Sequence, residues 1–342
     1  MAHGSQSNVR VHGGSRPRLA CPVCGGVYRA RYACCPADGT RLLPCARVPL
    51  VGKVLAGRYR IEAFLGEGAM GVVYRAMDTV RRRTIAIKVL HGELAADARS
   101  RLRLAREFSM TRKLDHPNVV AVIGYGSGGA APAHLVMEYS QGETLRDAIE
   151  RAAPVGAARA IDIGRQLARG LAHVHAAGLV HRDLKPENII LECRRGAAPV
   201  PRITDFGLAI SQHQLSHPSA RLTAVGYVMG TPSYLAPEQV QRRCVDHRAD
   251  LFSLGVILYE LLAARTPFDG TILQVVCGSV SGNVPPMRHR NPTVEVAPAL
   301  EAVVQRLLAR DPETRFQTAA DLAEALDSME GAPAPRAQPT ST

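Results

Sequence analysis

The sequence predicts an α+β protein of two lobes, a strand-rich first lobe and a helical second lobe, preceded by a small cysteine-rich segment. Two observations carry this prediction. Apolar and polar residues alternate through residues 59–90, on both sides of a glycine-rich turn, which is typical of strands. After Gly142 the apolar residues recur mostly at helical spacing. Because strands and helices occupy separate parts of the chain, we expect two lobes with a cleft between them.

The individual elements follow from the same patterns. Strands are expected within 59–90 and at 119–125, 134–139 and 201–204. Helices are expected at 98–114, 144–151, 157–177, 250–264, 299–309 and 319–328. The first of these helices should end before His116-Pro117, because proline disfavours helix in the residue before it. Residues 193–201, which include Gly196 and Pro199, are expected to form a surface loop.

Length and composition indicate a globular, soluble protein. The chain has 342 residues, of which 46% are hydrophobic, enough for one large two-part domain with small appendages. Residues 1–18 contain no apolar stretch that could act as a signal peptide, and the longest apolar run, 254–264, is too short to span a bilayer. We therefore expect a cytoplasmic protein that does not insert into a membrane.

The net charge of +12 is concentrated near the N-terminus. Residues 1–58 hold nine Lys or Arg and one acidic residue, Asp38, so they supply +8 of that charge. A basic arm could contact nucleic acid or an anionic membrane. A nucleic-acid module would need aromatic stacking residues, and this segment offers only Tyr28 and Tyr32. We interpret the arm as a solvated segment and do not expect nucleic acid as a partner.

A glycine-rich turn joins two of the expected strands. It reads Gly66-Glu67-Gly68-Ala69-Met70-Gly71-Val72-Val73. Glycines let the backbone close over phosphates and offer its N–H groups to them. A dinucleotide-binding turn has similar spacing, but there the glycines begin a helix, whereas a strand is expected here. The next strand carries Ile85-Ala86-Ile87-Lys88, which places Lys88 to neutralise nucleotide phosphates, and Glu107 on the following helix could supply its counter-charge.

Three further motifs lie in the second lobe. They are His181-Arg182-Asp183-Leu184-Lys185-Pro186-Glu187-Asn188, Asp205-Phe206-Gly207 and Ala236-Pro237-Glu238. Phosphoryl transfer requires positioning, charge neutralisation and one carboxylate that accepts or orients a hydroxyl proton, and Asp183 supplies that carboxylate. Lys185 can balance charge on the moving phosphoryl group. Asn188 and Asp205 offer oxygen atoms to a hard cation such as Mg²⁺.

With these five motifs in this order, the chain resembles the protein kinase superfamily, and most closely the eukaryotic-like bacterial serine/threonine kinases, over residues 59–329. The resemblance implies the bilobal protein kinase fold. The implied organisation is a disordered basic arm (1–17), a zinc-ribbon-like segment (18–46), a linker (47–58), a kinase domain with an N-lobe (59–139) and a C-lobe (140–329), and a disordered tail (330–342).

The resemblance also implies a role for each matching residue. ATP would be bound by Gly66, Glu67, Gly68, Ala69, Met70, Gly71, Val73, Ala86, Lys88, Met137, Glu138, Ser140 and Ile190. Catalysis would rest on Asp183 as base, Lys185 as the γ-phosphate contact and the Lys88–Glu107 ion pair, with Asn188 and Asp205 as ligands of Mg²⁺ or Mn²⁺. Asp250 would hold the catalytic loop from behind, and Glu238 would form a structural ion pair with Arg315.

The same resemblance implies protein substrates with Ser or Thr acceptors, because Lys185 stands two residues after Asp183. Arg182 implies activation by phosphorylation within residues 205–238, where Thr223 is the best-placed acceptor. A pseudokinase that acts as a scaffold is the alternative, but such proteins usually lack residues equivalent to Lys88, Asp183 or Asp205. The sequence does not specify the oligomeric state.

The cysteine-rich segment contains five of the eight cysteines. Cys21-Pro22-Val23-Cys24-Gly25 has the form of a zinc knuckle, and Cys35-Pro36-Ala37-Asp38-Gly39 resembles a second knuckle with Asp38 in place of cysteine. A structural zinc held by Cys21, Cys24, Cys35 and Asp38 is therefore expected, with Cys34 or Cys45 as substitute ligands. A ribbon without metal and a redox role for the Cys-x-x-Cys pair are the alternatives.

Overall fold

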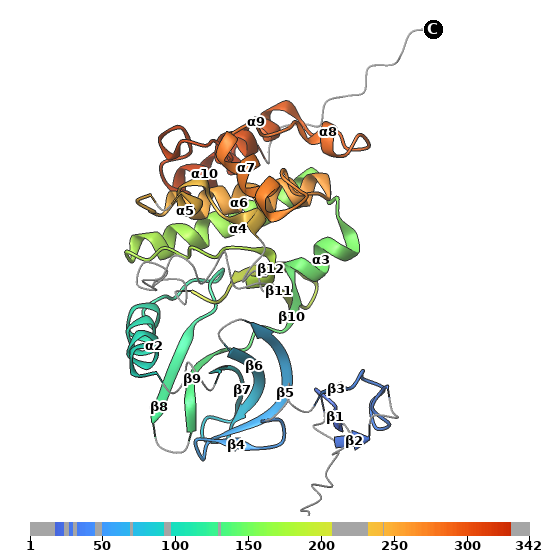
Figure 1. Ribbon diagram of the computed structural model, residues 1–342, viewed down its shortest axis with the longest axis vertical. Coiled ribbons are helices and arrows are strands. Elements are labelled where there is room, and N and C mark those ends of the chain that lie inside the picture. The colour runs from blue at the N-terminus through green and yellow to red at the C-terminus, as the bar shows by residue number, and fades with distance from the viewer. Residues whose placement is uncertain are drawn as a thin grey trace, which may run out of the picture. The chain divides into compact units, whose positions relative to one another are not determined.

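The computed structural model describes residues 18–23, 27–29, 33–44, 50–68, 71–91, 97–128, 131–206, 232–241 and 243–329 (Figure 1). The chain divides into two compact units. Unit 1 comprises residues up to Glu93 together with Gly126–His134, and unit 2 comprises Leu94–Tyr125 and the residues from Leu135 onward. Among the described residues, no helix has both the length and the apolar character needed to cross a bilayer.

A small antiparallel sheet forms the first part of unit 1. Its strands are β1 (Arg18–Ala20), β2 (Val27–Arg29) and β3 (Leu43–Pro44), in the order β2-β1-β3. Cys21, Cys35 and Leu42 are buried together, and Leu19 and Tyr28 pack against them. This core is very small, so it contributes little hydrophobic stabilisation on its own.

A larger curved sheet follows the small one. Its strands β4 (Val54–Leu55), β5 (Tyr59–Gly68), β6 (Gly71–Asp78) and β7 (Arg83–Leu90) are neighbours in that order, followed by β9 (Ala131–Glu138) and β8 (Val122–Gly128). Four of its six strands, β4 to β7, belong to unit 1. Buried and partly exposed residues alternate along β6, as expected for a sheet with one buried face. In β7, Ile85–Leu90 are all buried, which matches the apolar run in the sequence.

Unit 2 is mainly helical (Figure 1). Its helices are α2 (Ala98–Thr111), α3 (Leu145–Ala152), α4 (Ala157–Ala176), α5 (Pro237–Val240), α6 (Arg248–Ala263), α7 (Ile272–Ser281), α8 (Met287–Arg290), α9 (Pro298–Leu307) and α10 (Ala319–Asp327). Short 3₁₀ turns lie at Pro186–Asn188, Pro232–Tyr234 and Pro312–Thr314. A small antiparallel sheet contains β10 (Gly142–Thr144), β11 (Ile189–Arg194) and β12 (Ala197–Ile203), in that order.

Helix α6 is the centre of the unit 2 core. Every residue from Ala249 to Ala263 is buried, and α6 packs against α4 and α9 while α10 packs on α4. A helix that is apolar around its whole circumference has to be buried in this way. The arrangement places the charged residue of its first turn, Asp250, inside the protein.

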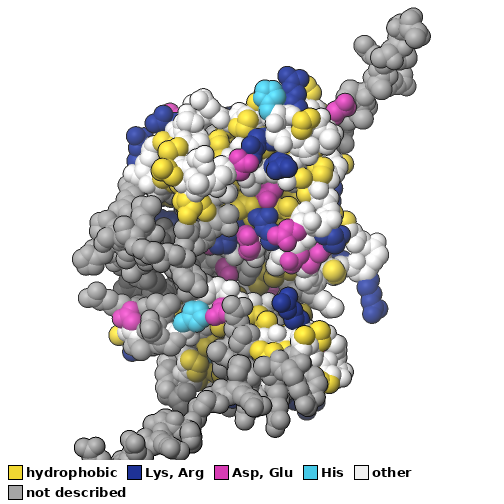
Figure 2. Space-filling model, turned by 45° about the vertical axis from the view of Figure 1, so that its right-hand side comes forward, with side chains coloured by type: hydrophobic (Ala, Val, Ile, Leu, Met, Phe, Trp, Pro, Cys, Tyr) yellow, Lys and Arg dark blue, Asp and Glu magenta, His cyan; other side chains and the backbone are white. Residues whose placement is uncertain are grey.

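The predicted helices are all present, with ends that differ from the prediction by at most three residues. Helix α7 and the short helices α5 and α8 were not predicted. The prediction of a surface loop at 193–201 is wrong, because most of these residues form the β11–β12 hairpin, in which Arg194 pairs with Ala197. On the face drawn in Figure 2, Lys and Arg side chains are interspersed with Asp and Glu among the described residues.

Candidate active site

The predicted catalytic loop is held by one buried carboxylate. Asp250, which is 0% exposed, accepts the backbone N–H groups of His181 and Arg182, each at 2.8 Å, and its Oδ2 lies 2.8 Å from Nε2 of His175. Burial alone would raise the pKa of Asp250, but the hydrogen bond from His175 and the nearby histidine rings outweigh it, so the pKa is lowered. The charged carboxylate thus fixes the backbone immediately before Asp183.

Asp183 itself is accessible. Its side chain is 45% exposed, and its Oδ2 accepts a bond of 2.8 Å from Nζ of Lys185. Nδ2 of Asn188 donates to the backbone oxygen of Asp183 at 2.8 Å and more weakly to Oδ2 at 3.3 Å. The carboxylate is therefore oriented by two neighbours and still open to an incoming hydroxyl group, as a general base requires.

Thr204 connects this loop to the segment that carries Asp205. The Thr204 oxygen lies 2.9 Å from Nε2 of His181, and its N–H donates to the Asn188 oxygen at 2.9 Å. Asp205 has a φ of +61° and Arg182 a φ of +64°. Such backbone strain in residues other than glycine is uncommon and gathers at functional sites. The structure therefore brings Asp183, Lys185, Asn188 and Asp205 into one neighbourhood.

The glycine-rich turn and Lys88 lie in unit 1. Gly68 is paired with Gly71 across the β5–β6 turn, and Val73 on β6 is opposite Lys88 on β7. Lys88 is 7% exposed. At Gly71 the neighbouring strand is so close that an added Cβ would lie 2.1 Å from the oxygen of Val89. Strand β6 thus connects the turn to the strand that carries Lys88.

The segment predicted to contact adenine, Glu138 to Ser140, begins with the last residue of β9. Met137 and Ser140 are each 5% exposed, and Glu138 between them is half-buried. The Glu138 N–H donates to the oxygen of Ala121 at 3.0 Å, which fixes the start of the segment. Ile190 lies partly exposed on β11, and Ala86 is buried on β7.

Some predicted residues cannot be placed in this description. Cys24, Cys45, Ala69, Met70, Gly207 and Thr223 lie outside the described residues. Glu107 lies on α2, but its side chain is not among those described, so its pairing with Lys88 stays a prediction.

The predicted structural ion pair is confirmed. Glu238 and Arg315 are both buried, and two parallel bonds of 2.7 and 2.8 Å join the guanidinium to the carboxylate. Arg315 also donates to the carbonyl oxygens of Ala309 and Arg248. Its charge and donors are thus largely satisfied inside the protein, as a buried ion requires.

Two arginines near the candidate site were missed by sequence reasoning. Arg146 on α3 donates to Glu187 at 3.2 Å and to Glu260 at 2.8 Å, and also bonds the hydroxyl of Tyr234. Arg202 on β12 contacts Glu138 and Ser140. In a chain that uses arginine at most of its basic positions, neither residue stands out in the sequence.

The cysteine-rich segment contains a compact cluster of three of the four predicted zinc ligands. One ligand atom each of Cys21, Cys35 and Asp38 lie within 4.8 Å of one another, and Sγ of Cys21 lies 3.2 Å from Oδ2 of Asp38. Hydrogen bonds from Thr40 lower the pKa of the exposed Asp38 carboxyl. A charged carboxylate beside two thiols is a donor set that zinc accepts. Cys34 is exposed and is not part of this cluster.

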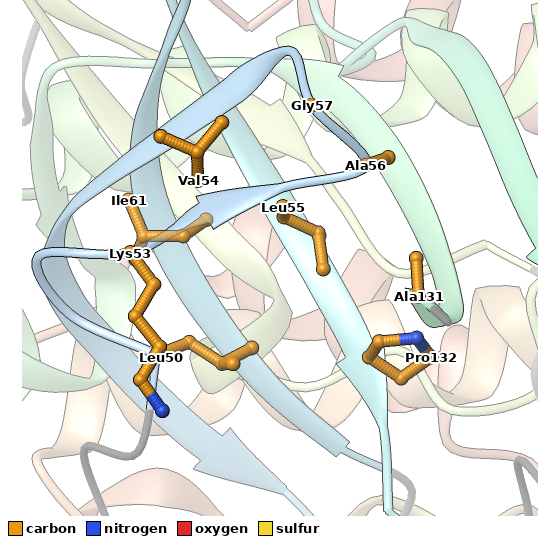
Figure 3. Close-up of a pocket in the computed structure, with 9 residues that line it drawn as sticks. All are labelled: Leu50, Lys53, Val54, Leu55, Ala56, Gly57, Ile61, Ala131 and Pro132. Atoms are coloured by element: carbon orange, nitrogen blue, oxygen red, sulfur yellow. The ribbon is translucent and has the colours of Figure 1, made fainter. Parts of the chain in front are cut away.

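An open hollow of about 530 Å³ lies elsewhere in unit 1, beside β4 (Figure 3). It is lined by Leu50, Lys53, Val54, Leu55, Ala56, Gly57, Ile61, Ala131 and Pro132. Lys53 is its single charged residue, and none of the predicted site residues line it. The hollow therefore offers none of the acid, base or phosphate-binding groups found around Asp183.

Comparison with known proteins gives a match to the protein kinase domain over residues 59–326. The chain is 36% identical over 266 residues to serine/threonine-protein kinase pkn3 of Myxococcus xanthus, covering 78% of this chain and 48% of that protein. It is 36% identical over 321 residues to serine/threonine-protein kinase Pkn1 of the same organism, covering 90% of this chain and 45% of that protein. This second match is longer than residues 59–342 could supply, so it extends into the segment before Tyr59.

The fold is also that of a solved kinase domain. The crystal structure of the Mycobacterium tuberculosis PknI kinase domain, a double mutant, matches 82% of this chain and 98% of its own length, with a TM-score of 0.61 and 26% identity. The predicted two-lobed fold class is thereby confirmed. The chain spans less than half the length of the two Myxococcus relatives.

Proposed function

This chain belongs to the protein kinase family, and on that premise we propose that it transfers the γ-phosphate of ATP to Ser and Thr hydroxyl groups of protein substrates. The observation that carries the proposal is the geometry of Asp183. Its carboxylate is solvent-accessible, while Lys185 and Asn188 orient it and Asp250 fixes the loop behind it. An exposed, oriented carboxylate can accept the proton of a substrate hydroxyl group.

The charges of ATP call for cationic side chains and metal ligands. Lys88 would neutralise the phosphates covered by the glycine-rich turn, and Lys185 would contact the phosphoryl group in transfer. Asn188 and Asp205 supply oxygen ligands, and because Nδ2 of Asn188 bonds Asp183, its amide oxygen remains for a cation. Mg²⁺ or Mn²⁺ held there would neutralise phosphate charge. With Lys88, Asp183 and Asp205 all present, a scaffold role without catalysis is not favoured.

The purified protein tests this proposal directly. With Mg²⁺ and labelled ATP, we expect it to phosphorylate itself and a generic protein substrate on Ser or Thr. Asp183→Asn and Lys88→Met should each lower the rate by at least about 100-fold without loss of the folded state. Asp115→Asn and Lys113→Met, which change exposed residues, serve as matched controls. Full activity of Asp183→Asn would refute the mechanism, and predominant phosphotyrosine would refute the acceptor.

We also propose that Thr223 is an autophosphorylation site that raises activity. The Nε atom of Arg182, next to Asp183, is buried and has no hydrogen-bond partner among the described residues. A phosphate group would supply a charged acceptor. We expect Thr223→Ala, and phosphatase treatment of the wild type, to lower the transfer rate several-fold. A Thr223→Ala rate equal to that of the untreated wild type would exclude this site.

The cysteine cluster adds a second component. We propose that Cys21, Cys35 and Asp38, with Cys24 as the fourth ligand, hold one structural Zn²⁺ that stabilises the small sheet. The use of ATP and the need for reduced thiols both favour the cytoplasm as the place of action.

A further inference from the structure

Arg202 joins three segments of unit 2 that are distant in sequence. It lies on β12, three residues before Asp205, and its side chain is only 13% exposed. Its Nη2 donates to Oε2 of Glu138 and to the oxygen of Val119, each at 2.8 Å. Its Nη1 donates to Oε1 of Glu192 at 3.1 Å and to Oγ of Ser140 at 3.2 Å. One guanidinium group thus makes four hydrogen bonds.

The two contacts with Glu138 and Ser140 flank Tyr139. Because side chains two residues apart in an extended segment lie on the same side, one planar donor can bind both. Arg202 therefore holds the beginning and the end of the segment that is expected to bind adenine. A lysine could not do this as well, because its ammonium is a single point charge and lacks the planar fork.

Backbone hydrogen bonds connect the same segments a second time. The Ile203 oxygen accepts the N–H of Val120 at 2.8 Å, and the Ala121 oxygen accepts the N–H of Glu138 at 3.0 Å. Strand β12 is thus connected to Glu138 once through residues 119–121 and once through Arg202. The two connections form a closed ring, which leaves Glu138 and the two residues after it little freedom to move relative to β12.

We propose that Arg202 is a positioning residue for adenine: it fixes Glu138–Ser140 against β12 and thereby sets the affinity for the adenosine part of ATP. This inference rests on the proposed function. Nε of Arg202 is buried without a hydrogen-bond partner among the described residues, so the position is not optimal for stability alone. The energetic cost of this unsatisfied donor is consistent with an arginine that is retained for its contacts with Glu138 and Ser140.

Arg202→Met tests the proposal, because methionine keeps the aliphatic stem and removes the charge and donors. We expect the dissociation constants of both ATP and adenosine, measured by calorimetry, to rise about tenfold, as for loss of one charge-assisted contact. The KM for ATP should rise with them, while kcat and the KM for the protein substrate stay within about twofold. Arg202→Lys should recover only part of the affinity.

Arg194→Met is the matched control. Arg194 lies on the same hairpin, is 52% exposed and has one loose ion pair, 3.8 Å from Glu192. We expect wild-type affinities in this variant. Equal adenosine binding by Arg202→Met and the wild type would overturn the inference, and so would a loss seen for ATP alone. Wild-type affinity for adenosine in Arg202→Lys would also overturn the inference, because a positive charge without the planar guanidinium would then be enough to position the segment.

Two further outcomes separate the inference from the proposed function. If the wild type binds neither ATP nor adenosine, the proposed function fails, and with it the inference. If Arg202→Met does not fold, Glu138→Ala and Ser140→Ala remove its two acceptors singly. Unchanged adenosine affinity in both of these variants would then overturn the role of Arg202.

Discussion

Asp183 lies in the catalytic loop and Asp250 on helix α6 behind it, and the two carboxylates differ in their surroundings. The side chain of Asp183 is 45% exposed and has Lys185 and Asn188 as neighbours. Asp250 is fully buried and accepts hydrogen bonds from the backbone N–H groups of two consecutive residues. The first arrangement leaves oxygen atoms for a substrate. The second uses its oxygen atoms inside the protein, so it can position the loop but cannot reach a substrate.

Replacement of Asp250 should therefore affect stability in a pH-dependent way. Asn at this position places an amide donor against the N–H groups of His181 and Arg182, so we expect Asp250→Asn to lower the unfolding free energy at pH 7 by about 1–3 kcal/mol. The pKa of Asp250 is lowered below its ordinary 3.8 on folding. Its charge-dependent stabilisation is thus present above pH 3.8 and is lost as pH falls through the folded-state pKa.

Urea unfolding of both proteins between pH 7 and pH 2 would measure this difference. The difference in unfolding free energy between the wild type and Asp250→Asn should become smaller as the pH falls below 3.8. The control Glu295→Gln, which changes an exposed residue, should have the same unfolding free energy as the wild type at each pH. A gap that stays constant down to pH 2 would show that the charge of Asp250 does not contribute.

At the scale of single residues, motif spacing predicted the residues grouped around Asp183 and the Glu238–Arg315 pair. It did not predict Arg202 or Arg146. Their partners, such as Glu138 and Glu260, are 64 and 114 positions away in the sequence, and no local pattern marks such pairs. Long-range ion pairs of this kind become visible only when the strands and helices are placed in space.

At the scale of elements, helical periodicity predicted the positions of the long helices well, whereas α7 and most of β12 were missed for identifiable reasons. Helix α7 is rich in β-branched residues, which favour strands, yet a capping box joins Thr271 to Gln274 at its start and Gly282 ends it with a φ of +76°. In β12, Pro199 and Pro201 argue against a strand. They are tolerated because β12 lies at the edge of its sheet.

The turn between β5 and β6 gives a prediction for its glycines. Gly71→Ala would place Cβ 2.1 Å from the Val89 oxygen, so β6 and β7 must separate locally, at a cost of about 1–3 kcal/mol. Gly66→Ala is the matched control, because no heavy atom lies within 4 Å of its added Cβ. Thermal unfolding should show a lower midpoint for Gly71→Ala than for Gly66→Ala. Equal midpoints would mean that β7 adjusts without strain.

At the scale of the whole molecule, unit 1 combines a sheet that has a substantial core with one that has almost none. The small sheet buries Cys21, Cys35 and Leu42, and it contacts the large sheet through a bond of 2.7 Å from the Phe64 N–H to the Pro22 oxygen. Phe64 lies on β5 two residues before Gly66, where the β5–β6 register shifts. The Cys21 knuckle thus supplies a backbone acceptor to the strand that leads into the glycine-rich turn.

A bound metal should therefore stabilise both the small sheet and this contact. Structural zinc contributes about 10–16 kcal/mol in zinc-finger peptides, far more than three buried side chains can supply. We expect about one equivalent of zinc in the wild type and less than a tenth in Cys21→Ser and in Cys35→Ser. Cys34→Ser, which changes the adjacent exposed cysteine, should retain the metal.

Hydrogen exchange links the metal to β5. Because the Phe64 amide is bonded to Pro22, deuterium uptake in residues 61–68 should rise when a chelator removes zinc from the wild type, and it should already be high in Cys35→Ser. Cys34→Ser should exchange as the metal-bound wild type does, and respond to the chelator in the same way. A wild type that contains zinc but shows the same uptake with and without chelator would separate the metal from β5. Absence of zinc from the wild type would leave the segment a ribbon without metal, in which the Cys21–Asp38 hydrogen bond at 3.2 Å takes the place of coordination.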